Sequence, residues 1–198
     1  MALVPEWGEG HYRRTMTLEI RPPTRAEVPA IVAMVHELAD YERAPDECHL
    51  TEAQLTEALF RPGAALFSHV AVADGELVGM SLWFLNFSTW VGRHGIYLED
   101  LYVRPSSRGS GAGRALLARL AAVCVERGYE RLDWWVLHWN PAREFYHAIG
   151  AKAMDEWIPY RLTEPALGVL AFTSAEDVAR ASARDSAPGD APGPVATP

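Results

Sequence analysis

The sequence predicts an α/β domain of the α+β type, in which a mixed central sheet with an antiparallel N-terminal meander is flanked by about four helices. Apolar residues recur at helical spacing between residues 24 and 60, alternate between residues 66 and 103, and recur at helical spacing again in residues 113–127. An Asp-Gly pair at residues 74–75 separates two alternating runs, which is a strong signal for an antiparallel hairpin. No internal repeat is visible.

The first elements are a short strand and two helices. Residues 17–21 alternate, and two prolines end this strand. Thr24 with Glu27, and Thr51 with Gln54, have the spacing of a capping box, in which two side chains satisfy the free N–H groups of a helix N-terminus. An apolar run of helical period follows each threonine, so a helix is expected after each.

The remaining elements are strands that are interrupted by two helices. Each of these helices is followed by a glycine, Gly128 or Gly150, which is the usual C-terminal signal. The expected helices span residues 113–127 and 141–149. The expected strands span residues 66–73, 76–87, 95–103, 131–138, 151–157 and 160–164.

One folded domain is expected over residues 17–172. Residues 1–16 show no periodicity and are predicted to be a flexible leader. Residues 173–198 consist mainly of Ala, Ser, Pro, Gly and Asp, and this composition cannot bury enough apolar surface to offset its ordering entropy. We therefore predict a disordered tail, with a frayed helix near residues 176–183.

Composition excludes several classes of partner. The net charge of −8 and the pI near 5.3 argue against nucleic acid and suit a cationic small molecule, although mild acidity is also usual for solubility alone. No apolar run approaches the roughly 18 residues of a membrane-spanning helix, and the first fifteen residues carry acids and arginines where a signal peptide is apolar. The two cysteines and seven scattered histidines have no metal-site spacing. A cytoplasmic protein without a metal is expected.

A glycine loop, Arg108-Gly109-Ser110-Gly111-Ala112-Gly113, stands between a predicted strand and a predicted helix. Converging backbone N–H groups, the helix N-terminus and the arginine would together bind a diphosphate, while a flexible turn is the alternative. A Walker loop is disfavoured because Gly113 is followed by Arg114 and Ala115 instead of Lys and Ser or Thr. The mid-chain position does not fit a dinucleotide-binding fold.

This loop matches the pyrophosphate motif Arg/Gln-x-x-Gly-x-Gly/Ala of the GNAT family of N-acetyltransferases, which the sequence resembles in the same order of elements. The resemblance implies the GNAT fold, acetyl-CoA as donor, direct transfer in a ternary complex, and a homodimer. Further matches narrow the resemblance to the diamine branch, the spermidine/spermine and thialysine acetyltransferases. They lie at residues 37–42, 50–52, 97–103, 139–140 and 144–151.

Two adjacent acids, Glu99 and Asp100, are the candidate groups for amine chemistry. An aliphatic amine has a pKa near 10, so it must be held as a cation and then deprotonated. Neighbouring side chains of a strand point to opposite faces, so both acids reach one site only if the strand bulges or ends there. The resemblance implies a bulge, with Glu99 removing the proton through water and Asp100 binding the cation. Pairing with nearby arginines is the structural alternative.

The resemblance also assigns residues to acetyl-CoA. Backbone N–H groups around Leu101, Tyr102 and Val103 would face the pantetheine arm and the thioester carbonyl, where negative charge develops. The glycine loop, through Arg108, Gly109, Gly111 and Gly113, would hold the pyrophosphate together with Arg114. Asn140 would bind the cofactor or act only as a helix N-cap. Tyr146 would protonate the departing thiolate, unless it is a plain tyrosine on the rim of its helix.

For the acceptor amine, the resemblance suggests Tyr41, Glu42 and Trp90. Ser88-Thr89 stands where the animal polyamine enzymes have an acid and a proline, so one anionic contact for a long polyamine is absent. The expected acceptor is thus a diamine, a polyamine or a lysine-like amine; the missing contact argues against spermine and spermidine and leaves shorter amines, lysine-like amino acids and other amino-bearing metabolites open. Acetylation of a protein amine, and a non-catalytic acyl-CoA-binding module, are the alternatives.

Overall fold

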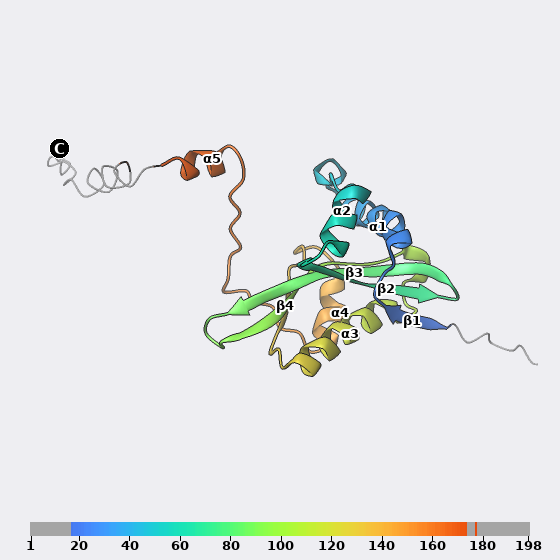
Figure 1. Ribbon diagram of the computed structural model, residues 1–198. Coiled ribbons are helices and arrows are strands. Elements are labelled where there is room, and N and C mark those ends of the chain that lie inside the picture. The colour runs from blue at the N-terminus through green and yellow to red at the C-terminus, as the bar shows by residue number, and fades with distance from the viewer. Residues whose placement is uncertain (1–16, 174–176, 178–198) are drawn as a thin grey trace, which may run out of the picture. The chain divides into compact units, whose positions relative to one another are not determined.

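The computed structural model describes residues 17–173 and residue 177 (Figure 1). The predicted leader, nearly all of the predicted tail and most of the helix expected near residues 176–183 lie outside the described residues. The chain divides into two compact units, with the boundary in the sequence between Phe145 and Tyr146, and each is described by itself. In the described residues, no helix is long and apolar enough to cross a membrane.

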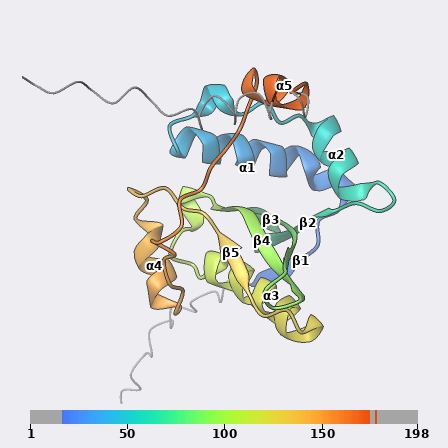
Figure 2. The ribbon, with the colours of Figure 1, turned by 90° about the vertical axis from the view of Figure 1, so that its left-hand side faces the viewer.

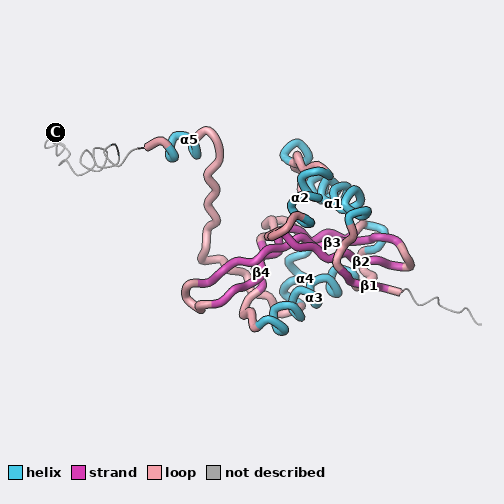
Figure 3. Tube along the Cα trace, viewed as in Figure 1, coloured by secondary structure: helices cyan, strands magenta, loops and turns pink. Residues whose placement is uncertain are grey.

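A five-stranded mixed sheet forms the centre of the first unit, as predicted (Figure 3). The strands follow their chain order across the sheet, the first four being antiparallel neighbours and the last running parallel to the fourth. Both residues of the Asp74-Gly75 turn have positive φ, 48° and 88°, as a type I′ hairpin requires. The strands are β1 (Leu18–Arg21), β2 (Leu66–Ala73), β3 (Glu76–Ser88), β4 (Arg93–Val103) and β5 (Leu132–Trp134).

Helices cover both faces of this sheet (Figure 2). Val70 and Met80 pack with Ile31 and other side chains from α1 and α2, whereas Ala71 packs on the opposite face with Leu116 of α3. The buried side chains around Ala71 are small, since three of the five in that cluster are alanines. The helices are α1 (Val28–Tyr41), α2 (Glu52–Phe60), α3 (Ala112–Arg127), α4 (Ala142–Ala148) and α5 (Ala166–Ala171), and the short 3-10 turns are η1 (Arg25–Glu27), η2 (Pro45–Glu47) and η3 (Pro105–Ser107).

The predicted capping boxes are both confirmed. The Thr51 N–H donates to the Gln54 side-chain oxygen at 2.9 Å, and the Gln54 N–H donates to the Thr51 hydroxyl at 3.3 Å. At the first box, the Glu27 carboxylate accepts from the Thr24 N–H at 2.7 Å, although the turn that follows is η1 and the α-helix begins only at Val28. The second helix therefore begins where the sequence predicts it, whereas the first begins one 3-10 turn later than predicted.

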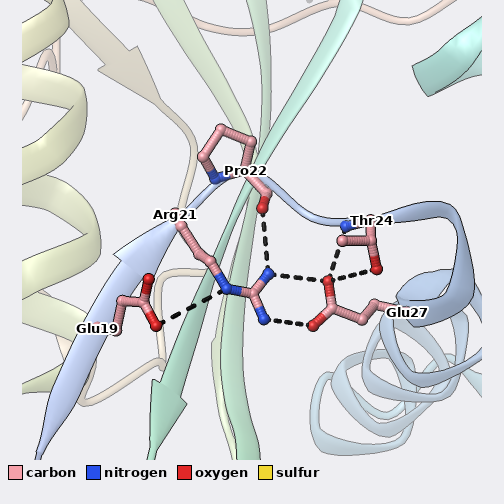
Figure 4. A network of polar contacts seen from close by, with 5 residues as sticks. All are labelled: Glu19, Arg21, Pro22, Thr24 and Glu27. Carbon is pink, nitrogen blue, oxygen red and sulfur yellow. Dashed lines mark hydrogen bonds and ion pairs between the residues drawn. The ribbon is translucent and has the colours of Figure 1, made fainter.

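The same Glu27 carboxylate connects β1 to the first helical turn (Figure 4). Arg21 donates to its two oxygens at 2.9 and 2.6 Å, and Glu19 lies 3.9 Å from the same guanidinium. The hydrogen bonds from Arg21 lower the pKa of Glu27 to about 2. The strand end and the helix start are thus held together by a bidentate ion pair.

The predictions for the last strands are wrong. β5 is three residues long instead of spanning 131–138, and no described residue of 151–164 is in a strand. An alternating pattern forms a strand only where a neighbouring strand supplies backbone hydrogen bonds. This segment has no such neighbour among the described residues, and its apolar side chains Met154, Ile158 and Tyr160 are exposed. The helix α5, which follows this segment, was not predicted.

Candidate active site

Strand β4 carries a bulge at Glu99. Leu82 of β3 pairs with Asp100 while the next residue, Trp83, pairs with Leu98, which leaves Glu99 as the extra residue. Leu98 and Asp100 therefore point to opposite faces of the sheet, although regular alternation would place them on the same face. The predicted bulge is confirmed, and it places Asp100 on the face that α1 covers.

The bulge also changes which backbone groups face the open edge of β4. Before it, the Ile96 N–H donates toward β5, to a carbonyl oxygen 3.1 Å away; after it, the Arg104 N–H donates to a carbonyl oxygen of β3 at 2.9 Å. Since the backbone N–H groups of successive strand residues point alternately to the two sides of the strand, the N–H groups of Leu101 and Val103 point away from β3. β5 pairs with β4 only as far as Leu98, so the N–H groups of Leu101 and Val103 meet no strand partner there.

Three carboxylates gather beside the bulge. Glu99 is exposed, Asp100 is partly buried, and Glu42 stands at the C-terminal end of α1. Burial, reinforced by the charges of Glu99 and Glu42, raises the pKa of Asp100 to about 7. Burial likewise raises the pKa of Glu42. A bound cation would relieve this clustering of negative charge, so the site suits a protonated amine.

The glycine loop contains two residues in the left-handed region of backbone conformation. Gly109 and Gly111 have φ values of 79° and 92°, which residues other than glycine rarely adopt. Gly111 precedes the first residue of α3, whose first N–H groups have no helical carbonyl to bind. Gly113 lies inside the helix, where an added Cβ would make an ordinary 3.7 Å contact with Val103.

Arg108 connects this loop to the end of α1. Its Nε donates to the Val103 carbonyl oxygen at 3.2 Å. Its guanidinium carbon lies 4.8 Å from the centre of the Tyr41 ring and 5.8 Å from that of Tyr102. The side chain is therefore anchored by a hydrogen bond and two aromatic faces. Arg114 is exposed in the first turn of α3, beside the same loop.

The segment before α4 also meets Tyr41. The Tyr41 hydroxyl donates to the Asn140 side-chain oxygen at 3.4 Å, and the same oxygen accepts from the Ala142 N–H at 2.9 Å. Asn140 therefore acts as an N-cap, which is one of the two roles expected for it from the sequence. Trp139 packs near Tyr41 and receives the Arg43 guanidinium over its ring at 4.6 Å.

Sequence reasoning did not assign Trp139 and Arg43 to the site. Trp139 was visible as half of a Trp-Asn match, and that was its one signal in the sequence. Arg43 has no signal in the sequence, because its position depends on a backbone φ of 65° that a non-glycine residue seldom adopts.

One predicted site residue, Trp90, is not brought to this cluster. Trp90 lies in the β3–β4 turn and is 90% exposed. Six strand residues separate it from the bulge, a span of roughly 20 Å at about 3.3 Å per residue. Tyr146 is partly buried in α4 and belongs to the second compact unit. The catalytic and binding roles assigned from the sequence remain predictions.

No group of three or more His, Cys, Asp and Glu side chains in the described part of the chain could hold a metal ion.

Comparison with known proteins gives consistent matches. The model of the acetyltransferase (GNAT) family matches residues 31–151. A thialysine N-epsilon-acetyltransferase of Bos taurus is 35% identical over 166 residues, covering 77% of this chain and 96% of that protein. An L-ornithine N5-acetyltransferase of Arabidopsis thaliana is 27% identical over 213 residues, covering 84% of this chain and 92% of that protein. An integron cassette protein from the mobile metagenome of V. cholerae has a similar structure, with a TM-score of 0.65, 28% identity and coverage of 78% and 98%.

Proposed function

This chain belongs to the GNAT family of acetyltransferases, and on that premise we propose that it acetylates a primary amine of a small diamine or a lysine-like amino acid. Family membership makes acetyl-CoA the donor. The names of two relatives, a thialysine and an ornithine acetyltransferase, support an acceptor whose amine ends a short aliphatic chain.

The observation that carries the proposal is the carboxylate cluster beside the open edge of β4. Glu42, Glu99 and Asp100 together favour a cation, as the raised pKa of Asp100 indicates. The N–H groups of Leu101 and Val103 are close in sequence to Glu99 and Asp100 and have no strand partner on that edge. Cation binding and carbonyl polarisation would therefore occur side by side.

The proposed proton transfers begin at the acids. Asp100, with Glu42, holds the protonated amine. Glu99, exposed at the bulge, accepts its proton through a water molecule, which leaves the nitrogen lone pair free to form the new bond to the carbonyl carbon. Leu101 and Val103 donate their N–H groups toward the carbonyl oxygen, where charge develops during the attack.

The proposal assigns the last proton to Tyr146. As the carbon–sulfur bond breaks, the phenol hydroxyl donates its proton to the sulfur, which leaves as a thiol. The nitrogen, which after the attack carries one hydrogen more than an amide, loses a second proton to solvent as the carbon–sulfur bond breaks. The proton that Glu99 removed also returns to solvent, and solvent reprotonates the tyrosine. Tyr146 receives this role from the family motif that contains it.

The loop residues fit the pyrophosphate of the donor. Gly109 and Gly111 have the positive φ values that turn backbone N–H groups toward one point, and Arg108 adds a formal charge. Arg114 adds a second charge at the first turn of α3. Asn140 already binds Tyr41 and the start of α4, so its contribution to the donor would be in addition to its N-cap role.

The proposal extends to a homodimer in the cytoplasm. The resemblance to the diamine branch supports the dimer. Two free cysteines, Cys48 and Cys124, support a reducing compartment. Trp90 is exposed in the β3–β4 turn, and its assignment to the acceptor site rests on resemblance alone.

An amine panel assayed by CoA release tests the acceptor class. Thialysine, lysine, ornithine, putrescine and spermidine are compared with lysine-containing peptides, and the Glu99→Gln variant serves as the matched loss-of-base control. Turnover with the shorter free amines, reduced in Glu99→Gln, is the expected result. Turnover with peptides alone would show a protein acetyltransferase, and acetyl-CoA binding without turnover would show a non-catalytic module.

A further inference from the structure

A pocket separate from the candidate active site lies on the face of the sheet that α3 covers, near the start of β2. Its volume is about 310 Å³, the lower end of the range for small-molecule sites. Its strand residues come from β2 and β3, while the candidate active site lies along the bulge and open edge of β4. The two sites share no residue.

The pocket exists because β1 is shorter than β2. β1 pairs with residues 70–73 of β2, and then the chain turns away at Pro22-Pro23. The β2 edge at residues 66–69 is therefore not covered by β1, and those two prolines, the end of α2 and the last turns of α3 surround it. Phe67 and Trp83, stacked with ring centres 4.6 Å apart, form an apolar wall.

A buried histidine supplies a hydrogen-bond donor to this pocket. His69 lines it and is 5% exposed. The Trp83 indole N–H donates to His69 Nδ1 at 3.2 Å, so the proton of the neutral ring is on Nε2. Burial, with the nearby charge of Arg119, lowers the pKa of His69 to about 4, and the ring is neutral at pH 7. Nε2–H has no acceptor among the described residues.

Two arginines give the pocket a positive charge. Arg119 and Arg127 line it from α3, and none of the lining residues is acidic. Arg119 binds Glu126 at 3.0 Å, but both side chains are more than a third exposed, and exposed pairs of this kind are weak. Arg127 forms no hydrogen bond or ion pair with another described residue.

We propose that this pocket binds a small organic carboxylate, whose apolar body packs against Phe67 and Trp83 and whose carboxylate accepts from His69 Nε2, Arg119 and Arg127. Guanidinium groups can bind carboxylates bidentately, and the Nε2–H donor of His69 would favour a ligand with an acceptor. The apolar walls distinguish this ligand from a bare inorganic anion. This site is additional to the proposed acetyl transfer.

A matched pair of probes tests the proposal. 4-Phenylbutanoate and its neutral amide have nearly the same shape and differ in charge, and their affinities are measured by calorimetry on the full chain. The carboxylate is expected to bind at least about tenfold more tightly than the amide, since charged hydrogen bonds contribute about 1.5 to 3 kcal/mol. Equal affinities, or no saturable binding of the carboxylate, would overturn the proposal.

Variants identify the binding residues. The double variant Arg119→Gln/Arg127→Gln should reduce carboxylate affinity to that of the amide. Arg93→Gln, which removes an exposed arginine from β4 outside the pocket, should leave it unchanged. The ¹⁵N resonance of His69 Nε2 should shift on addition of the carboxylate to the wild-type protein. An unshifted resonance, or undiminished affinity in the folded double variant, would place the ligand elsewhere. None of these readouts depends on acetyl transfer.

Discussion

Arg108 lies with its guanidinium carbon 4.8 Å from the centre of the Tyr41 ring, while its Nε donates to Val103. The glycine loop, the end of α1 and the open edge of β4 are therefore connected by one side chain. Its Nε is engaged, and no hydrogen bond of its Nη groups to another described residue occurs. We propose that these groups contact the pyrophosphate of the donor.

Replacing Arg108 with alanine should weaken acetyl-CoA binding by about 10- to 100-fold, the value of one or two charge-assisted hydrogen bonds. Acetyl-pantetheine lacks the pyrophosphate, so its affinity should change little. Arg108→Lys should recover only part of the loss, because an ammonium group lacks the planar fork. Calorimetry with both ligands is the measurement, and equal losses for the two would contradict a pyrophosphate contact.

Asp100→Asn should stabilise the free protein at pH 8 while weakening amine binding. The pKa of Asp100 is about 7, against an ordinary value of 3.8, so the folded state binds the proton more tightly. Stability from this group is therefore greatest below about pH 4 and is lost as the pH rises through 7.

The variant avoids that loss, with an expected gain on the order of 1 kcal/mol at pH 8 and little difference at pH 4. Urea unfolding at the two pH values measures it, and the exposed Asp46→Asn serves as the control. A variant that is less stable than wild type at pH 8 would show that Asp100 is a stabilising partner of another group.

Glu27→Gln should destabilise the protein near neutral pH. Arg21 lowers the pKa of Glu27 to about 2, from 4.5, so its contribution is present above pH 4.5 and is lost as the pH falls toward 2. Because the pair is partly exposed, about 1 to 2 kcal/mol is expected at pH 7. Glu19→Gln is the matched control, since Glu19 approaches the same arginine at only 3.9 Å. Equal effects of the two substitutions on the urea midpoint would refute the special role of Glu27.

Tyr146→Phe should lower kcat by roughly 10²-fold, the lower end of the range for positioned acid catalysis, because a thiolate leaves more readily than an alkoxide. Packing and acetyl-CoA affinity should be nearly unchanged, since the ring is kept. Single-turnover kinetics, with binding measured separately, isolate the chemical step. Near-normal chemistry in the variant would remove Tyr146 from the mechanism.

Local sequence signals predicted most of the fold. Asp74-Gly75, the capping threonines and the glycines after α3 and α4 each act through bonds within a few residues, and all lie where expected. The ends of strands depend on partners distant in the chain. β5 stops opposite Leu98 because the bulge then turns β4 out of register, which no pattern within residues 131–138 reveals.

The candidate site divides in the same way. The loop and the acid pair were visible as motifs, but the pKa of Asp100 depends on Glu42, 58 positions earlier in the chain, and on burial beneath α1. The contact between Arg108 and Tyr41 likewise joins elements that only the folded sheet brings together. Trp90, predicted from resemblance, lies apart from the cluster because its turn is at the far end of β3 and β4.

The unpaired position of Glu99 has a consequence for how this enzyme can diversify. A residue without a cross-strand partner can be exchanged for another type with little disturbance of the sheet. Deleting it is different, because β4 would regain regular alternation, and Asp100 and the N–H groups beyond it would turn to the wrong sides. The sheet therefore constrains the length of β4 at this position more strongly than the type of side chain. A substitution at residue 99 changes the chemistry of the site and leaves the backbone around Asp100 in place, whereas a deletion changes both.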